Sequence, residues 1–227
     1  MLLFYAPANM NRYLILFLTI ATLASHAIAE SEDWISLFNG KDLSNWRTNR
    51  AEGSFTVKDG LLVAHSLDLR SHLFYVGESE DFVSFKNFEL IVVAKGAPES
   101  NSGIFIHTDY ALRDEMGHLA NGYEVNLNTS LDVSRKTGSL YDVINLVEAP
   151  LDDTQWFQTR IRVNGKRIQV WLDGKQVIDY REPENPKRKE SRKGRLLNLN
   201  GGAIALQAHD PHSTWYFREI RVKRLKE

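Results

Sequence analysis

The sequence predicts an all-β protein, an antiparallel two-sheet β-sandwich of the jelly-roll type. Apolar and polar residues alternate in many short segments, as in Asn121-Gly-Tyr-Glu-Val-Asn-Leu-Asn128, and this period of two is typical of strands with one buried face. Turn pairs such as Asp59-Gly60 and Asn164-Gly165 separate several of these segments. No strong helical period and no internal repeat is present. Many short strands joined by glycine-bearing turns favour a sandwich or jelly roll.

The composition is that of an ordinary globular protein. The chain has 227 residues, 43% hydrophobic and 25% charged, with a formal net charge of −1, so nothing in the overall charge indicates a nucleic-acid partner. It contains no cysteine, which excludes thiolate catalysis, disulfides and thiolate-zinc sites.

The first residues have the pattern of a secretory signal. Asn11-Arg12 precedes an apolar run over residues 13–24, and Ala27-Ile28-Ala29 has the small-x-small form of a cleavage site. We therefore predict a signal peptide at residues 1–29, with Met10 as an alternative start, and one β domain at residues 30–227. A membrane anchor is the alternative, but the run is shorter than the roughly 20 apolar residues that a spanning helix needs. The expected location is periplasmic or extracellular, without stable membrane insertion.

The strands are expected in the following order. A short strand at residues 34–38 ends at Asn39-Gly40, and a loop with apolar anchors at Leu43 and Trp46 follows. Asp59-Gly60 joins a hairpin, since this pair is the strongest short-range hairpin signal. The expected strands after that loop cover residues 54–58, 61–65, 73–76, 82–95, 102–108, 121–128, 203–208 and 215–222.

A meander of three antiparallel strands is expected between Trp156 and Tyr180. A two-residue turn at Asn164-Gly165 would pair Ile161 with Ile168, and Asp173-Gly174 would bring Val177 opposite Val170. Apolar residues meet across most of this register, whereas a slip of one residue would move each side chain to the other face.

Residues 182–195 carry charges and prolines without any period. They predict a long solvated loop, because segments of this kind form neither strand nor helix. The functional alternative is a basic patch for an anionic polysaccharide or a membrane surface.

Polar groups alternate with buried ones on several strands, which predicts a ligand site on one sheet face. Small residues among them would leave room for the ligand, while long polar or aromatic ones would supply contacts. The candidates are Glu124 and Asn126 on one strand, Phe105 and His107 beside Gly103 on a second, Gln207 and His209 beside Ala203 and Ala205 on a third, and Ser139 and Tyr141 at residues 137–141.

At these stretches the sequence resembles the 3-keto-disaccharide hydrolase domain family. The resemblance covers essentially the whole chain after the signal, and the order of its pieces makes it specific. The pieces are Leu37-Phe-Asn-Gly-Lys-Asp-Leu43 with Trp46, Asn101-Ser-Gly-Ile-Phe105, Gly122-Tyr-Glu-Val125, Thr137-Gly-Ser-Leu-Tyr141, Val170-Trp-Leu-Asp-Gly174, and Gly202 through Ile204-Ala-Leu-Gln-Ala-His209.

The resemblance implies a concanavalin A-like fold and action on glycosides oxidised at C3 of the sugar. Their C3 ketone acidifies the C2 proton, so the glycosidic bond can be lost by elimination and water added afterwards. This chemistry needs a base near C2 and groups that polarise the ketone. It implies Glu124, His209 or His107 as catalytic residues, and a carbohydrate as the partner. Substrate contacts would come from Asn126, Tyr141, Gln207, Phe105 and Ser139.

Some alternatives stay open. No cofactor is expected, although a divalent metal held by Glu124 and the histidines is an alternative, since imidazole and carboxylate suit such ions. The family often has Arg where His107 stands and Gln where Asn126 stands. A non-catalytic carbohydrate-binding module and a cell-envelope domain are the other functions that this fold could serve. The sequence predicts no oligomeric state.

Overall fold

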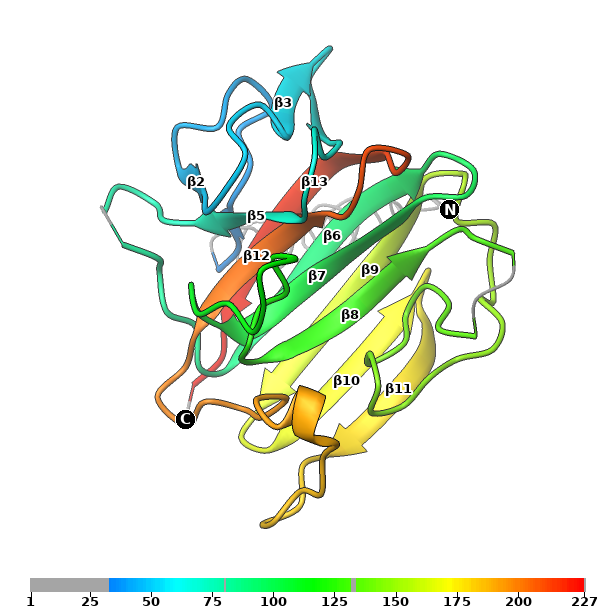
Figure 1. The fold of residues 1–227 in the computed structure, drawn as a ribbon. Coiled ribbons are helices and arrows are strands. Elements are labelled where there is room, and N and C mark those ends of the chain that lie inside the picture. Colours follow the sequence, from blue (N-terminus) through cyan, green and yellow to red (C-terminus); the bar gives the residue numbers. More distant parts are fainter. Residues whose placement is uncertain (1–32, 80, 132–133, 227) are drawn as a thin grey trace, which may run out of the picture. The chain divides into compact units, whose positions relative to one another are not determined.

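The expected all-β architecture is confirmed by the computed structural model of the chain, which describes residues 33–226 except 80, 132 and 133. Two antiparallel sheets lie in the unit Ser36–Glu227 and pack face to face. Figure 1 shows β12, β7 and β8 of one sheet in front of β13, β6 and β9 of the other. The predicted signal peptide, residues 1–29, lies outside the described residues.

The smaller sheet carries the site described below. Its five strands follow the order β2-β5-β12-β7-β8. In that order their bounds are β2 (Trp46–Thr48), β5 (Ser71–Tyr75), β12 (Ala203–Ala208), β7 (Asn101–Thr108) and β8 (Tyr123–Asn128).

The larger sheet forms the second layer and follows the order β11-β10-β9-β6-β13-β4-β3. Its strands are β11 (Lys175–Arg181), β10 (Arg167–Leu172), β9 (Phe157–Asn164), β6 (Phe88–Gly96), β13 (Trp215–Arg224), β4 (Leu61–Ala64) and β3 (Phe55–Lys58). The two-residue strand β1 (Ile35–Ser36) comes first in the described chain.

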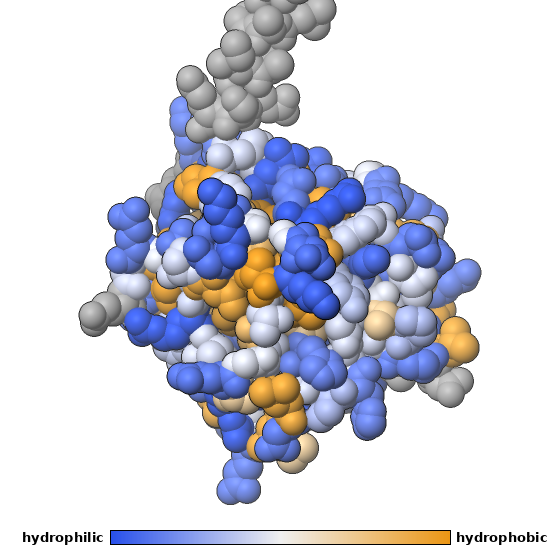
Figure 2. All heavy atoms as spheres, turned by 90° about the horizontal axis from the view of Figure 1, so that it is seen from above, coloured by the Kyte–Doolittle hydropathy of each residue, from blue (hydrophilic) through white to orange (hydrophobic). Residues whose placement is uncertain are grey.

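The core lies between the two sheets and follows the alternation of the strands. Val92 and Ile161 of the larger sheet and Val125 and Leu206 of the smaller sheet are fully buried in one cluster. Trp46 belongs to the same cluster, and its indole Nε1–H donates to the Leu37 carbonyl at 2.8 Å. Seen from above, polar and charged side chains surround a smaller apolar area of the surface (Figure 2).

The expected hairpin register at residues 156–172 is wrong by two positions. Ile161 pairs with Val170 rather than Ile168, because Asn164 still belongs to β9 and the turn consists of Gly165 and Lys166. Gly165 has φ +56°, which suits the first central position of a type II′ turn. Since the error is an even number, every side chain keeps its expected face.

Other boundaries also differ from the expectation. The turn at Asp173-Gly174 is confirmed, since Leu172 pairs with Lys175, but a bulge after Val170 makes Ile178 its partner instead of Val177. The strand expected to begin at residue 82 begins only at Phe88. Trp46, expected in a loop, starts β2 and pairs with Tyr75. In the part of the chain that the structure describes, none of the helices has the length and apolar character needed to cross a bilayer.

Candidate functional site

A pocket lies on the outer face of the smaller sheet, where loops cover the strands. It encloses about 50 Å³ and opens to solvent at its mouth. Its lining comes from β7, β8 and β12 and from the loops beside them. The lining residues are Arg70, Asn101, Phe105, His118, Leu119, Glu124, Tyr141, Arg192, Arg195, Gln207 and His209.

A buried ion pair forms one wall of this pocket. Arg195 Nη2 donates to Glu124 Oε2 at 2.8 Å, and the two side chains are only 5% and 8% exposed. Burial raises the pKa of Glu124, although the guanidiniums of Arg195 and Arg70 oppose this shift. Arg195 also lies over the ring of Phe105, which pairs across the strands with Glu124. The carboxylate is therefore fixed in position and keeps its proton more readily than an exposed glutamate does.

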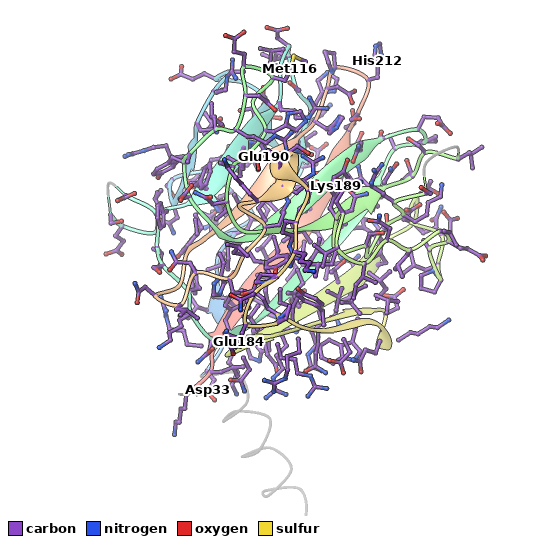
Figure 3. The ribbon with its side chains drawn as sticks, turned by 60° about the horizontal axis from the view of Figure 1, so that its bottom comes forward. Asp33, Met116, Glu184, Lys189, Glu190 and His212 are labelled. Atoms are coloured by element: carbon purple, nitrogen blue, oxygen red, sulfur yellow. The ribbon has the colours of Figure 1, made fainter. Side chains whose placement is uncertain are left out.

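The segment that supplies Arg195 is anchored to the fold. Residues 182–195 contain no strand, only the 3-10 turn η1 (Glu190–Arg192), so the irregular structure was predicted correctly. The expectation of a solvated loop is wrong at its two ends, because Glu182 and Arg195 are both buried. Figure 3 shows Lys189 and Glu190 of this segment in front of the strands.

Buried and partly buried hydrogen bonds hold that segment against β8 and β11. The hydroxyl of Tyr123 donates to Glu182 Oε2, which also accepts from the Leu197 backbone N–H at 2.9 Å. Arg188 Nη2 donates to the hydroxyls of Tyr123 at 2.8 Å and Tyr180 at 2.6 Å. Tyr123 directly precedes Glu124, so this cluster links the position of the segment to that of the carboxylate.

Tyr141 lines the pocket between two guanidiniums. The Arg135 and Arg192 guanidinium carbons lie 5.1 and 5.2 Å from the centre of its ring. Both arginines share the carboxylate of Asp142, Arg135 through Oδ1 at 2.8 Å and Arg192 through Oδ2 at 2.7 Å. Burial and the charge of Glu124 raise the pKa of Tyr141, so the phenol stays neutral and can donate a hydrogen bond.

The protonation of His209 follows from its partners. Its Nε2 lies 2.9 Å from Arg70 Nη2 and 3.2 Å from Asn101 Nδ2, and because both are donors, Nε2 must accept. Nδ1 therefore carries the proton and donates to Asp210 Oδ2. Burial and the Arg70 charge lower the pKa of His209, which agrees with a neutral ring.

The side-chain amide of Gln207 is held by the buried His72. Its Nε2 lies 3.2 Å from His72 Nε2, and burial lowers the pKa of His72 to about 3, so this ring is neutral and accepts. Gln207 Oε1, Asn101 Oδ1 and Arg195 Nε are buried atoms without a hydrogen-bond partner among the described residues. They belong to three pocket residues and can serve as two acceptors and one donor for a polar ligand.

The face that the alternation predicts to be wet is in fact covered. All six residues of β8 are buried, because residues 138–141 run beside this strand and exchange backbone hydrogen bonds with Glu124 and Asn126. The Asn126 amide donates to the Arg135 carbonyl, and Ser139 Oγ accepts from the Leu146 N–H. Neither of these two side chains lines the pocket.

His107 does not share the face of Phe105 as the alternation predicts. Its φ is +52°, and a bulge between the pairs Thr108–Ala203 and Phe105–Ala205 turns it out of the row. Its Nε2 lies 2.9 Å from the Lys86 carbonyl, to which it donates, and it is not a pocket residue. Nor does the described part of the chain contain a group of three or more His, Asp or Glu side chains placed to hold a metal.

Small residues make room for the carboxylate, as the sequence suggested. A Cβ on Gly103 would lie 2.9 Å from Glu124 Oε1 and 3.0 Å from its Cγ. Ala205 pairs with Phe105 on the next strand. The predicted candidates that line the pocket are therefore Glu124, Phe105, Tyr141, Gln207 and His209, whereas His107, Asn126 and Ser139 lie elsewhere.

The sequence analysis did not predict the three arginines and the histidine that line the pocket, Arg70, Arg192, Arg195 and His118. Arg70 and His118 come from loops with no pattern, and Arg192 and Arg195 come from the segment expected to be solvated. The only signal for the last two was the basic character of residues 182–195, which supported the alternative of an anion-binding patch.

Comparison with known proteins gives a consistent picture. Residues 33–223 match the family of 3-keto-alpha-glucoside-1,2-lyase-like domains. A 3-keto-disaccharide hydrolase of Bacteroides thetaiotaomicron is 25% identical over 240 residues, with 86% of this chain and 80% of the relative covered.

Solved structures share the fold. A protein from Parabacteroides distasonis ATCC 8503, described as a glycosyl hydrolase by its name alone, superposes with a TM-score of 0.70 at 20% identity, covering 87% of this chain and 96% of that one. The exoplasmic/lumenal domain of VIP36, bound to Ca²⁺ and Man3GlcNAc, superposes with a TM-score of 0.56 at 13% identity, covering 86% of this chain and 90% of that one.

Proposed function

Because the chain belongs to the family of 3-keto-alpha-glucoside-1,2-lyase-like domains, we propose that it is a carbohydrate-active enzyme that cleaves glycosides oxidised at C3. The observation that carries this proposal is Glu124, a buried carboxylate of raised pKa that lines a pocket together with hydrogen-bonding groups. The similarity to a 3-keto-disaccharide hydrolase supports the substrate class.

The proposed reaction begins with removal of a proton from C2. The ketone at C3 makes this proton acidic, and the electron pair of the C2–H bond moves into an enolate. The enolate then forms the C1–C2 double bond as the glycosidic C1–O bond breaks, and the leaving oxygen takes a proton. Addition of water across that double bond completes a net hydrolysis.

Glu124 is the base in this proposal. Its Oε2 is engaged by Arg195, and no described residue donates a hydrogen bond to Oε1, which leaves that oxygen for the C2 proton. A base is most effective when its pKa approaches the working pH, and burial moves the pKa of Glu124 in that direction.

Arg195 and the amides would bind the sugar around this base. The unpartnered Nε–H of Arg195 is a donor for the ketone oxygen, and the guanidinium charge stabilises the enolate that forms there. Gln207 Oε1 and Asn101 Oδ1 are acceptors for sugar hydroxyls. His209 acts as a positioning residue, because its Nε2 lone pair is already engaged by Arg70 and Asn101.

The test compares Glu124→Gln with Glu89→Gln on a 3-keto-disaccharide and on the corresponding unoxidised disaccharide. Glu89 is the matched control, because it pairs with Arg160 in the larger sheet and is no part of the pocket. The wild type and Glu89→Gln should cleave the oxidised sugar only, and Glu124→Gln should lose about 10²–10⁴-fold in turnover, the usual contribution of a general base. Binding of the oxidised sugar without cleavage by the wild type would indicate a carbohydrate-binding module instead.

Export is a separate part of the proposal and is based on the sequence pattern alone. We propose that residues 1–29 direct export, so the N-terminal sequence of the protein recovered outside the cytoplasm should begin at Glu30. A protein that keeps residues 1–29 in that fraction would contradict this.

A further inference from the structure

The lining of the pocket holds more guanidiniums than carboxylates. In the part of the chain that the structure describes, Arg70, Arg192 and Arg195 line it, and Glu124 is the one carboxylate among the lining residues.

The imbalance is located at Arg70. Arg195 has its own carboxylate in Glu124, and Arg192 has one in Asp142, which it shares with Arg135. Arg70 instead donates to the neutral Nε2 of His209, and no described carboxylate forms an ion pair with it. A guanidinium has five N–H donors, so this single bond leaves most of them to a ligand.

The position of Arg70 separates it from the reacting atoms. It directly precedes β5, whereas Glu124 lies on β8, and β12 and β7 lie between these two strands in the sheet. A sugar whose C2 lies at Glu124 would extend over β7 and β12 toward Arg70. A substituent of that sugar or of its leaving group would therefore meet the uncompensated guanidinium.

From this arrangement we propose that the pocket selects glycosides carrying an anionic substituent, a carboxylate as in a uronic acid or a sulfate ester, and that Arg70 binds it. Arginine suits this task because its planar fork matches the oxygens of such groups. The inference rests on the proposed function for the position of the sugar, but anion binding itself can be measured without turnover.

Binding is the first arm of the test. Calorimetric titration of the whole protein with D-glucuronate, D-glucose 6-sulfate and D-glucose should show that at least one anionic sugar binds 10-fold or more tightly than glucose. The preferred anion then identifies the substituent. Equal affinity for all three sugars would overturn the proposal whether or not the protein cleaves keto sugars.

Turnover is the second arm, and it uses Arg70→Gln, Arg70→Lys and the control Arg160→Gln. Arg160 lies over Trp171 in the larger sheet, away from the pocket. Arg70→Gln should lower kcat/KM about 10- to 100-fold more for a 3-keto-glucuronide than for a 3-keto-glucoside, the size of one charged hydrogen-bond contact. Arg70→Lys should recover part of this selectivity, and Arg160→Gln should keep all of it.

The outcomes of the second arm separate the two proposals. An equal loss on both substrates in Arg70→Gln would place Arg70 in the chemistry of the ketone and overturn the anion subsite while leaving the proposed function intact. No turnover of either substrate by the wild type would contradict the proposed function. The calorimetric titration would then still show whether the pocket binds an anionic substituent. Thermal unfolding of Arg70→Gln shows whether the variant is folded.

Discussion

Arg195→Met is the perturbation that tests the buried ion pair of the pocket. The variant keeps an unbranched stem up to the position of Nε but leaves the Glu124 carboxylate without its partner at 2.8 Å, and both side chains are nearly inaccessible to water. Removing one partner of a buried pair costs about 3–5 kcal/mol, because the remaining charge is uncompensated. We expect that loss in the free energy of unfolding at pH 8.

The loss should depend on pH in a definite direction. The pKa of Glu124 in the folded protein is raised by burial and held down by Arg195, so removing Arg195 raises it further. A carboxyl with a raised folded pKa contributes stability that is fully present below its unfolded pKa and is lost as the pH rises through the folded pKa. Glu124 of the variant is therefore protonated to a greater extent at pH 5 than at pH 8, and the stability deficit should be smaller at pH 5.

The assay is urea unfolding followed by tryptophan fluorescence at both pH values. Arg167→Met is the control, since Arg167 and Asp179 form an ion pair at 2.5 Å in which both side chains are over 40% exposed. Such an exposed pair contributes little, so this variant should lose much less stability. The double variant Glu124→Gln/Arg195→Met should recover part of the loss. An equal deficit at pH 5 and pH 8, or one no larger than that of Arg167→Met, would refute the reasoning.

Two further predictions concern the groups around Glu124. Gly103→Ala places a Cβ 2.9 Å from Glu124 Oε1 and displaces the carboxylate. Turnover of a 3-keto-disaccharide should therefore fall more than about 10-fold, and overpacking should cost about 1–3 kcal/mol in the free energy of unfolding. Unchanged turnover would mean that the carboxylate is not held where the reaction needs it. Asp210→Asn replaces the charged acceptor of His209 Nδ1–H with a neutral amide oxygen. The charge of Asp210 raises the pKa of this ring, so the His209 NMR titration should move to lower pH; a titration like that of the wild type would contradict the assigned contact.

The sequence predicted the fold well because each strand carries its own signal. Alternation placed Phe105, Glu124 and Gln207 on the outer face of one sheet, and this local rule needs no knowledge of the rest of the molecule. The order of the sheet, which makes β12, β7 and β8 neighbours, depends on long-range pairing that alternation does not encode.

The candidate residues that were misplaced or missed in the site depend on packing between segments that alternation within one strand does not describe. His107 leaves the predicted face because β7 bulges against β12, and Asn126 is covered because residues 138–141 bond to β8. Arg195 reaches Glu124 because Tyr123 and Glu182 anchor a segment that has no period of its own. Composition indicated the charge of that segment but not the strand against which it packs.

The most direct test of the proposed chemistry is the isotope at C2 of the product. The wild-type protein and Glu124→Gln are incubated with a 3-keto-disaccharide in D₂O, and the deuterium at C2 of the released keto sugar is measured against an incubation without protein. Removal of the C2 proton by Glu124 followed by addition of water predicts deuterium at C2 in the wild-type product above that background, and almost no product from the variant. Cleavage by the wild type with ordinary hydrogen retained at C2 would contradict it.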